Sequence, residues 1–294
     1  MSKKMFLFGV VLIFFMDFSF VSPVGAQMVK EIAVGVFSNA PSQVELDRFY
    51  LRYHGPEITL LSGPWMTRYR LWPPYEAPEE AVERFGAVQG RYAELWYPSE
   101  EAYMDRPLHG YMSQANWGAV QGKSDQLAVM VPAKPTERFY DTNPNPVDGS
   151  LVRWISIIAY PEGVSIEEGE EWFLNVHAKE AAKQPGLLKF VSYSILMELG
   201  DKMLEMMMEA MARPSSDDGR GGGMPPVMAD KKAWVRVNEY WYRDFDDWRE
   251  AVIESPPNYT APPWGGEYPF VDMVSMFIPY MHDVDFLKGD YVIP

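Results

Sequence analysis

The chain has 294 residues and an apolar content of 47%, enough to bury the cores of two domains of ordinary size. Its formal net charge of −15 disfavours nucleic acid as a partner, because phosphate groups carry the same sign. The sequence contains no cysteine, which excludes disulfides, thiolate metal ligands and cysteine nucleophiles.

The N-terminal segment has the pattern of a secretory signal peptide. Two lysines precede an apolar run at 5–16 that is too short to span a bilayer. Small residues before Gln27 predict cleavage there, so we assign residues 1–26 to the signal peptide and expect a secreted or periplasmic protein. A start of translation at Met28 would instead make the protein cytoplasmic. We expect no contact with a membrane after signal cleavage.

Residues 29–133 predict a unit with the order β-α-β-β-α-β. Alternating residues at 30–37 are typical of a strand, and apolar residues at helical spacing predict a helix over 42–61. A short additional helix is expected between the second and third strands. The remaining predicted elements of this unit are strands at 65–72, 91–97 and 126–133, and helices at 77–86 and 99–106.

Residues 151–282 predict the same order of elements again, after a linker at 134–150 that is rich in Pro, Asn and Asp. A Met- and Gly-rich insertion at 201–230 interrupts this second unit, and 283–294 forms a C-terminal tail. The methionines of the insertion fall at helical spacing, which predicts an apolar helix closing over a ligand pocket. The predicted strands are 151–160, 187–196, 233–242 and 270–280, and the predicted helices are 165–184, 201–212 and 244–254.

The two units also share short stretches of sequence. Aligning His54 with His177 brings Tyr50 over Phe173 and Glu57 over Glu180, a shift of 123 residues. Further on, residues 94–103 lie over 239–248 without a gap, with matching Glu, Trp and Tyr. Two such matches in the same order indicate two diverged copies of one unit. The predicted fold class is therefore α+β, with two tandem ferredoxin-like βαββαβ units.

The helix around the first of these histidines resembles the first-helix motif of the EthD family, within the dimeric α+β barrel superfamily. That motif is roughly an aromatic residue, His-Gly-Pro-Leu, and then Pro-Gly-Leu followed by Tyr. The first copy keeps His54-Gly55-Pro56, and the second keeps Pro185-Gly186-Leu187. The resemblance covers 30–282. It implies that the two units form, within one chain, the barrel that simpler relatives form by dimerising, with a ligand pocket between the sheet and the helices of a unit.

Both histidines are candidates for general acid–base chemistry. An imidazole titrates near neutrality and can accept a proton from a C–H or O–H acid. On a helix, Tyr50, His54 and Glu57 share one face, so the carboxylate can orient the ring, and the same spacing holds in the second copy. Gly55-Pro56 is expected to disturb the helix, which favours His54 over its counterpart. The alternative is that both histidines only pack against the sheet. The second-copy residues with the same predicted roles are Phe173, His177 and Glu180.

The strands supply further candidates. Tyr69 is expected to hold or protonate a carbonyl oxygen, and Tyr193 occupies a similar place in the second copy. Glu and Trp at alternate positions share one face of each third strand and predict the wall of an aromatic pocket, although plain core packing explains them as well. These residues are Glu94, Trp96, Glu239 and Trp241.

Three functions remain open, because the sequence has no phosphate-binding loop, nucleophile elbow or dinucleotide fingerprint. The first is a cofactor-independent lyase, cyclase, dehydratase or isomerase acting on an apolar aromatic or polyketide-like molecule. The second is a haem-dependent or cofactor-free oxidase of the same superfamily, for which the resemblance implies His177 as a haem ligand. The third is a non-catalytic binder of apolar molecules. No metal is expected, and the chain is expected to be a monomer or a homodimer.

Overall fold

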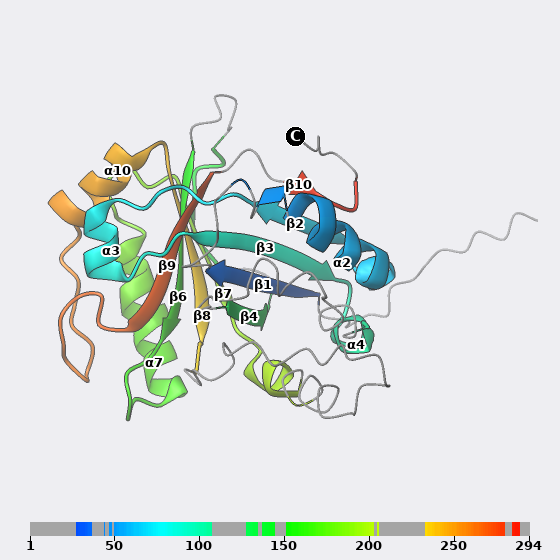
Figure 1. Cartoon of the computed structure of the whole chain (residues 1–294). Coiled ribbons are helices and arrows are strands. Elements are labelled where there is room, and N and C mark those ends of the chain that lie inside the picture. Colours follow the sequence, from blue (N-terminus) through cyan, green and yellow to red (C-terminus); the bar gives the residue numbers. More distant parts are fainter. Residues whose placement is uncertain are drawn as a thin grey trace, which may run out of the picture.

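The computed structural model describes residues 28–36, 44, 47–48, 50–107, 128–134, 137–144, 151–202, 205, 233–279 and 284–288. These residues form a mixed α+β structure with two five-stranded antiparallel sheets (Figure 1). The predicted signal peptide lies outside the described residues and stays a prediction. Within the described residues, we found no helix with the length and apolar character needed to cross a membrane.

The first sheet has the strand order β10-β2-β3-β1-β4. Four of its strands and three helices follow the order predicted from the sequence. Ser99 caps the last helix by accepting the backbone N–H of Ala102, and Gly86 ends the short helix in the left-handed region at φ 57°. The elements are β1 (Val29–Val36), α2 (Gly55–Ser62), β2 (Arg68–Trp72), α3 (Glu79–Phe85), β3 (Gly90–Tyr97), α4 (Glu100–Asp105) and β4 (Ala128–Ala133).

The second sheet has the equivalent order β5-β7-β8-β6-β9. Its helices begin at side-chain caps, Ser165 for the first and Asp244 for the last. The elements are β6 (Val152–Ala159), α7 (Ile166–Trp172), α8 (Ala178–Ala181), β7 (Lys189–Ser194), β8 (Arg236–Tyr242), α10 (Phe245–Arg249) and β9 (Asp272–Pro279). The predicted Met-rich helix and its stripe at Met203, Met206, Met207 and Met211 lie outside the described residues.

The two sheets agree in register as well as in strand order. An offset of 123 relates β1 to β6, an offset of 121 relates β2 to β7, and an offset of 145 relates β3 to β8 and β4 to β9. For example, Ile32 pairs with Glu94, and its counterpart Ile155 pairs with Glu239. A residue of one unit therefore has a defined counterpart in the other, and these offsets are used below.

Each sheet is completed by a strand that follows the other unit in the chain. The predicted linker contains β5 (Glu137–Asp141), which follows the first unit and pairs with β7 of the second sheet. The predicted tail contains β10 (Val284–Asp285), which follows the second unit and pairs with β2 of the first sheet. Sequence reasoning treated both segments as irregular because neither is long enough to show a strand period.

The sheets face each other across an apolar cluster to which both contribute, including Ile32 and Tyr92 from the first and Ile155 and Val237 from the second. Backbone bonds also join the sheets at their edges. Tyr75 N–H donates to the carbonyl of Phe277 on β9, and Leu196 N–H donates to the carbonyl of Pro132 on β4. The two units thus enclose a shared interior within one chain, as the sequence predicted.

Four buried charges interrupt this apolar interior. Lys30 Nζ lies 2.7 Å from a carboxylate oxygen of Glu94. Arg153 lies 2.8 Å from an oxygen of Glu239 and 3.4 Å from Glu94. Under the strand offsets Lys30 corresponds to Arg153 and Glu94 to Glu239, so each unit supplies one cation and one carboxylate. Arg153 links the two units, because it binds a carboxylate of each.

Aromatic donors complete the network around Glu239. Tyr193 OH donates to one carboxylate oxygen at 3.1 Å, and Trp241 Nε1 donates to the other at 2.6 Å. Burial alone would raise the pKa of Glu239. Arg153 and Lys30, together with hydrogen bonds from Arg153 and Trp241, outweigh that effect and lower it. Glu239 is therefore held as a carboxylate inside the protein.

The connections between the second and third strands of each unit are also exchanged. Helix α3 of the first unit packs on the second sheet, where Phe85 contacts Trp154 and Trp248 with ring centroids 5.2 Å and 6.5 Å away. In the opposite direction, Leu196 and Leu199 of the second unit lie in the core cluster of the first. The segment leading to the predicted Met-rich helix thus contacts the core cluster of the first unit.

Gly55 is required by a close contact with the exchanged C-terminal segment. A Cβ atom at this position would overlap the ring of Phe286, which stacks on Tyr69 at 4.7 Å. We expect Gly55→Ala to lower the free energy of unfolding in urea by about 1–3 kcal/mol, the usual cost of overpacking a core.

In a Phe286→Ala background the overlap is gone. The same Gly55→Ala change should then cost nothing, or stabilise the helix by up to about 1 kcal/mol. An equal cost in both backgrounds would show that the ring does not constrain this position.

Candidate functional site

Both histidines close a π-helical turn at equivalent places. These turns span Tyr50–His54 (η1) and Phe173–His177 (η3), five residues each and 123 positions apart. The helix continues without a break through Gly55-Pro56, because His54 has helical backbone angles and α2 begins at the next residue. The second copy forms the same π turn before Ala178, so the Gly-Pro pair does not cause the distortion. Such turns frequently occur at functional sites.

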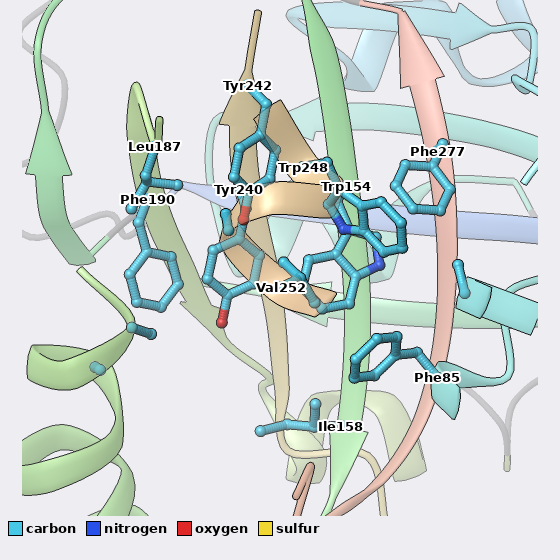
Figure 2. Close-up of a cluster of buried hydrophobic side chains, with 14 of the residues drawn as sticks. Phe85, Trp154, Ile158, Leu187, Phe190, Tyr240, Tyr242, Trp248, Val252 and Phe277 are labelled. Carbon is cyan, nitrogen blue, oxygen red and sulfur yellow. The ribbon is translucent and has the colours of Figure 1, made fainter. Parts of the chain in front are cut away.

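Large aromatic side chains stand as a floor on the face of the second sheet that lines a cavity beside His177, and Figure 2 shows four of them, Phe190, Tyr240, Trp154 and Phe277. One register line carries four aromatic residues, and neighbouring rings stack across the strands with centroids 4.3 Å, 5.2 Å and 6.4 Å apart. The next register line on the same face of the sheet carries only Ser and Asn. The aromatic line is Phe190, Tyr240, Trp154 and Phe277, and the polar line is Ser192, Asn238, Ser156 and Ser275.

The cavity is small and open in part to solvent, and it lies between this floor and the helix that carries His177. His177 lines it together with Phe173 and Tyr268, and two members of the polar line, Asn238 and Ser156, also lie in its wall. The cavity therefore brings an imidazole, a phenol, an amide and a hydroxyl together inside aromatic walls. The other lining residues are Trp154, Ile158, Trp172, Tyr240, Pro269, Val271 and Met273.

Aromatic rings hold the imidazole from several elements. Trp172 lies 5.0 Å from it and Tyr259 lies 5.3 Å from it, both close to parallel with the ring. Tyr259 belongs to the segment before β9 and stacks on Tyr268 at 4.4 Å. Glu180 fixes that segment, because its oxygens accept the Thr260 hydroxyl at 2.6 Å and the Thr260 N–H at 2.9 Å. Glu180 thus positions the cover of the cavity.

Burial sets the protonation state of the site. It lowers the pKa of His177 to about 4, and the weaker attraction of Glu180 only partly opposes this shift. The ring is therefore neutral at pH 7, and its Nδ1 has no hydrogen-bond partner among the described residues. Burial also raises the pKa of Tyr268 well above 10, so this side chain stays a phenol. The site holds a base and an acid, both uncharged.

In the first unit Phe286 stacks on Tyr69, as Phe139 stacks on Phe190 in the second, and a T-shaped contact of 5.1 Å joins Tyr50 to His54. Burial lowers the pKa of His54 to about 4 as well. Glu57 is partly buried on the following turn. The cavity described above lies beside His177, the second of the two predicted bases.

The predicted strand residues lie elsewhere. Tyr193 belongs to the cluster between the sheets, on the face opposite to the aromatic floor. Lys30 lies 5.0 Å from the Trp96 ring, and Arg153 lies 5.3 Å from the Trp241 ring, so both tryptophans pack on the central cations. Together with Glu94 and Glu239 these residues form the shared interior and not the wall of the cavity.

Sequence reasoning missed Ser156, Asn238, Trp172 and Tyr268. The first two break apolar runs at positions that face the helices, and this is a signal the sequence does contain, because buried strands seldom carry Ser or Asn there. Tyr268 lies in an irregular segment between η5 (Glu250–Glu254) and β9, where no periodicity marks an inward-facing side chain.

The residues around His177 do not fit a haem. Trp172 and Tyr259 occupy the two closest near-parallel positions at the ring, and Tyr268 lies at 6.4 Å. The enclosed part of the cavity is far smaller than a tetrapyrrole. A tetrapyrrole would have to displace the segment that Glu180 anchors.

Comparisons with known proteins find distant similarity in structure. No protein-family model matches the sequence, and no curated protein matches it. Among solved structures, an anthrone oxidase-like protein shares 10% identity with a TM-score of 0.49, covering 92% of this chain and 98% of its own. A chlorite dismutase from Candidatus Nitrospira defluvii shares 8% identity with a TM-score of 0.40, covering 86% and 92%.

A presumed monooxygenase of Fusobacterium nucleatum shares 7% identity with a TM-score of 0.43, covering 89% and 98%. These neighbours belong to the dimeric α+β barrel superfamily, and the EthD family is not among the matches. At identities of 10% or less, none of them assigns an activity to this chain. Its α+β architecture rests on the strand order and register described above.

Proposed function

We propose that this protein is a cofactor-independent enzyme that removes a proton from a small apolar carbonyl compound, with His177 as the general base. The observation that carries the proposal is the neutral, buried imidazole beside an aromatic cavity, with Nδ1 unpartnered among the described residues. Cofactor-independent lyases, cyclases, dehydratases and isomerases can each begin with such a proton transfer.

The cavity walls favour a flat apolar substrate. Phe173, Trp172 and Tyr240 offer ring faces and edges, against which another ring packs favourably. The enclosed space is small, so binding of a ring requires the cover that carries Tyr259 to move. A polar substituent is accommodated only where the wall is polar, at Asn238 and Ser156.

The low pKa of the base shapes the chemistry. In the proposed step a C–H bond next to the carbonyl breaks, its proton moves to the imidazole, and its electron pair moves to the carbonyl oxygen as an enolate. Burial disfavours the imidazolium that forms, so the step needs the enolate charge close by. Return of the proton to the same or another carbon gives exchange or isomerisation.

We also propose that the two units arose by duplication and that only the second retained a site. The strand offsets are the support for this proposal. In the first unit the counterparts of Ser192, Asn238 and Ser156 are apolar. Those apolar counterparts are Leu71, Ala93 and Ala33.

The test is hydrogen exchange into 2-tetralone, a two-ring ketone with an acidic C–H group, followed by NMR in D₂O. We expect the protein to accelerate deuterium incorporation next to the carbonyl, and His177→Gln to reduce that acceleration by about 10²–10⁴-fold. His54→Gln is the matched control, because His54 has the same helix position in the first unit, where the polar line is missing. It should leave the rate unchanged.

Two results would contradict the proposal. Equal exchange by the wild type and His177→Gln would remove the histidine from the reaction. Binding of 2-tetralone by the wild type without faster exchange would make the protein a carrier of apolar molecules.

A further inference from the structure

The polar line is a row of buried polar side chains on an otherwise largely apolar face of the second sheet. Ser192, Asn238, Ser156 and Ser275 occupy four neighbouring strands on one register line, and each is at most 2% exposed. Buried polar groups cost free energy unless they are hydrogen-bonded, so their bonding decides what the line can do.

The bonds along this line run in one direction. Arg236 NH1 donates to the Ser192 hydroxyl at 3.1 Å. That hydroxyl then donates its own hydrogen to Asn238 Oδ1 at 2.7 Å. Because the amide oxygen is engaged, the amide nitrogen of Asn238 is left to donate, and it reaches Ser156 Oγ at 3.4 Å. A guanidinium has donors and no acceptor, so it fixes the direction of every later bond.

The line ends in hydrogens without described acceptors. Ser156 accepts from Asn238, so its own O–H is available, and no acceptor for it is found among the described residues. The Asn238 amide carries a second N–H with the same property. Both side chains line the cavity beside His177. Ser275 is not available, because its hydroxyl donates to the carbonyl of Phe85 at 3.1 Å.

We propose that Ser156 O–H and Asn238 N–H form a donor pair that binds the carbonyl oxygen of the substrate and the enolate oxygen derived from it. The inference rests on the proposed function and names its substrate class, an enolisable ketone on a flat apolar frame. Donors fixed before the reaction stabilise the oxygen where its charge develops. These donors stabilise the negative charge of the enolate, which a base as weak as His177 needs if it is to remove the proton.

Arg236 acts on this pair through Ser192 and is a positioning residue. Its charge is compensated, because Nε and NH2 bind the Glu170 carboxylate and NH1 binds Glu137 at 2.7 Å. The site therefore suits a neutral carbonyl and not a free anion. The guanidinium sets the direction of the hydrogen bonds that run from Ser192 to Ser156, and cooperativity between these bonds strengthens the effect.

The first unit offers an internal comparison. Its counterparts of Arg236 and Glu170 are Arg91 and Asp47, which also form an ion pair. The charged start of the line is thus present in both units. Its continuation is not, since Leu71, Ala93 and Ala33 carry no hydrogen-bonding side chain. A structural need for the ion pair alone does not account for the polar line beside the cavity.

The experiment measures binding of 2-tetralone and of tetralin, the same two-ring frame without the oxygen. We expect Ser156→Ala and Asn238→Ala, which introduce the residues of the first unit, each to weaken 2-tetralone binding about 3- to 10-fold, the range for a neutral hydrogen bond. Tetralin affinity should change less than twofold. The carbonyl stretch of bound ¹³C-labelled 2-tetralone should move to higher wavenumber in both variants.

Positioning and control variants complete the design. Ser192→Ala should shift the carbonyl stretch in the same direction by a smaller amount. Ser194→Ala, on the same strand and face but off the line, should shift nothing. Should Ser156→Ala fail to fold, Ser156→Cys keeps the size with a weak donor and is expected to behave alike.

Three outcomes would overturn the donor pair. These are no binding of 2-tetralone, unchanged binding in both alanine variants, or an equal loss of affinity for tetralin. If the donor effects appear but His177→Gln exchanges like the wild type, the pair stands and the general base is wrong.

Discussion

Replacing Arg153 with methionine is expected to lower the free energy of unfolding at pH 7 by about 3–5 kcal/mol, as for other broken buried ion pairs. The guanidinium lies 2.8 Å from Glu239 and 3.4 Å from Glu94, and both carboxylates are buried. Without it, two carboxylates share the single cation of Lys30. One negative charge is then left without compensation in the shared interior.

The reference variants separate this effect from packing. Lys189→Met removes a cation that also lies over the Trp241 ring, at 4.6 Å, but pairs with Asp141 at 3.6 Å near the rim. It should cost about 0–1 kcal/mol. The double change Arg153→Met with Glu239→Gln removes the surplus charge and should recover most of the loss. Urea unfolding of the wild type and the three variants gives these free energies of unfolding. If Arg153→Met costs no more than Lys189→Met, the role assigned to Arg153 is wrong.

Acid should distinguish wild type from Arg153→Met as well. The folded pKa of Glu239 is lowered, so its contribution to stability is complete above the unfolded value near 4.3 and is lost as the pH falls through the folded value. The deficit of the variant should therefore shrink below about pH 4.3. A deficit that stays constant into acid would mean that Glu239 is not the affected partner.

The second large effect that we expect is a fall in the free energy of unfolding, caused by His177, as the pH drops from 6.5 to 4. Burial lowers its folded pKa to about 4, while the unfolded chain binds a proton near 6.5. In this window the unfolded state holds more protons, so stability rises with pH at up to about 1.4 kcal/mol per unit. Over the window the difference amounts to about 3 kcal/mol. Below pH 4 both states are protonated and the loss is complete.

His177→Phe keeps an aromatic ring in place and removes the titration. The difference in unfolding free energy between wild type and this variant, measured in urea at pH 7, 6, 5 and 4, should therefore change by about 3 kcal/mol. The subtraction is needed because burial raises the pKa of Glu31, which changes stability with pH in the opposite sense. A difference that is flat with pH would mean that the imidazole is solvated in the folded protein.

Much of the fold follows from local patterns. Alternation and helical spacing predicted the described strands and helices of both units in the right order, and the predicted helix end at Gly86 is a real one. The shift of 123 found around His54 and His177 is the offset that relates β1 to β6 in the structure. Local order was readable because it depends on neighbours in the chain.

The site was harder to predict, because it depends on whether a given face of a strand contacts the helices or the other sheet. Alternation correctly placed Glu94 and Trp96 on one face, but it does not say whether that face meets helices or the other sheet. The same ambiguity hid Asn238, whose neighbour Glu239 attracted attention. The exchanged strands β5 and β10 were missed because their partners lie in the other unit, beyond any sequence period.

Because β10 pairs with β2 of the first unit, the order of synthesis matters for folding. A ribosome releases the first unit long before Val284 and Phe286 exist, yet these residues pair with β2 and fill the space beside Gly55. Until they arrive, the nascent first unit has an unpaired strand edge at β2 and an uncovered apolar surface beside Gly55, both of which favour aggregation. A segment synthesised after the second unit thus completes the first.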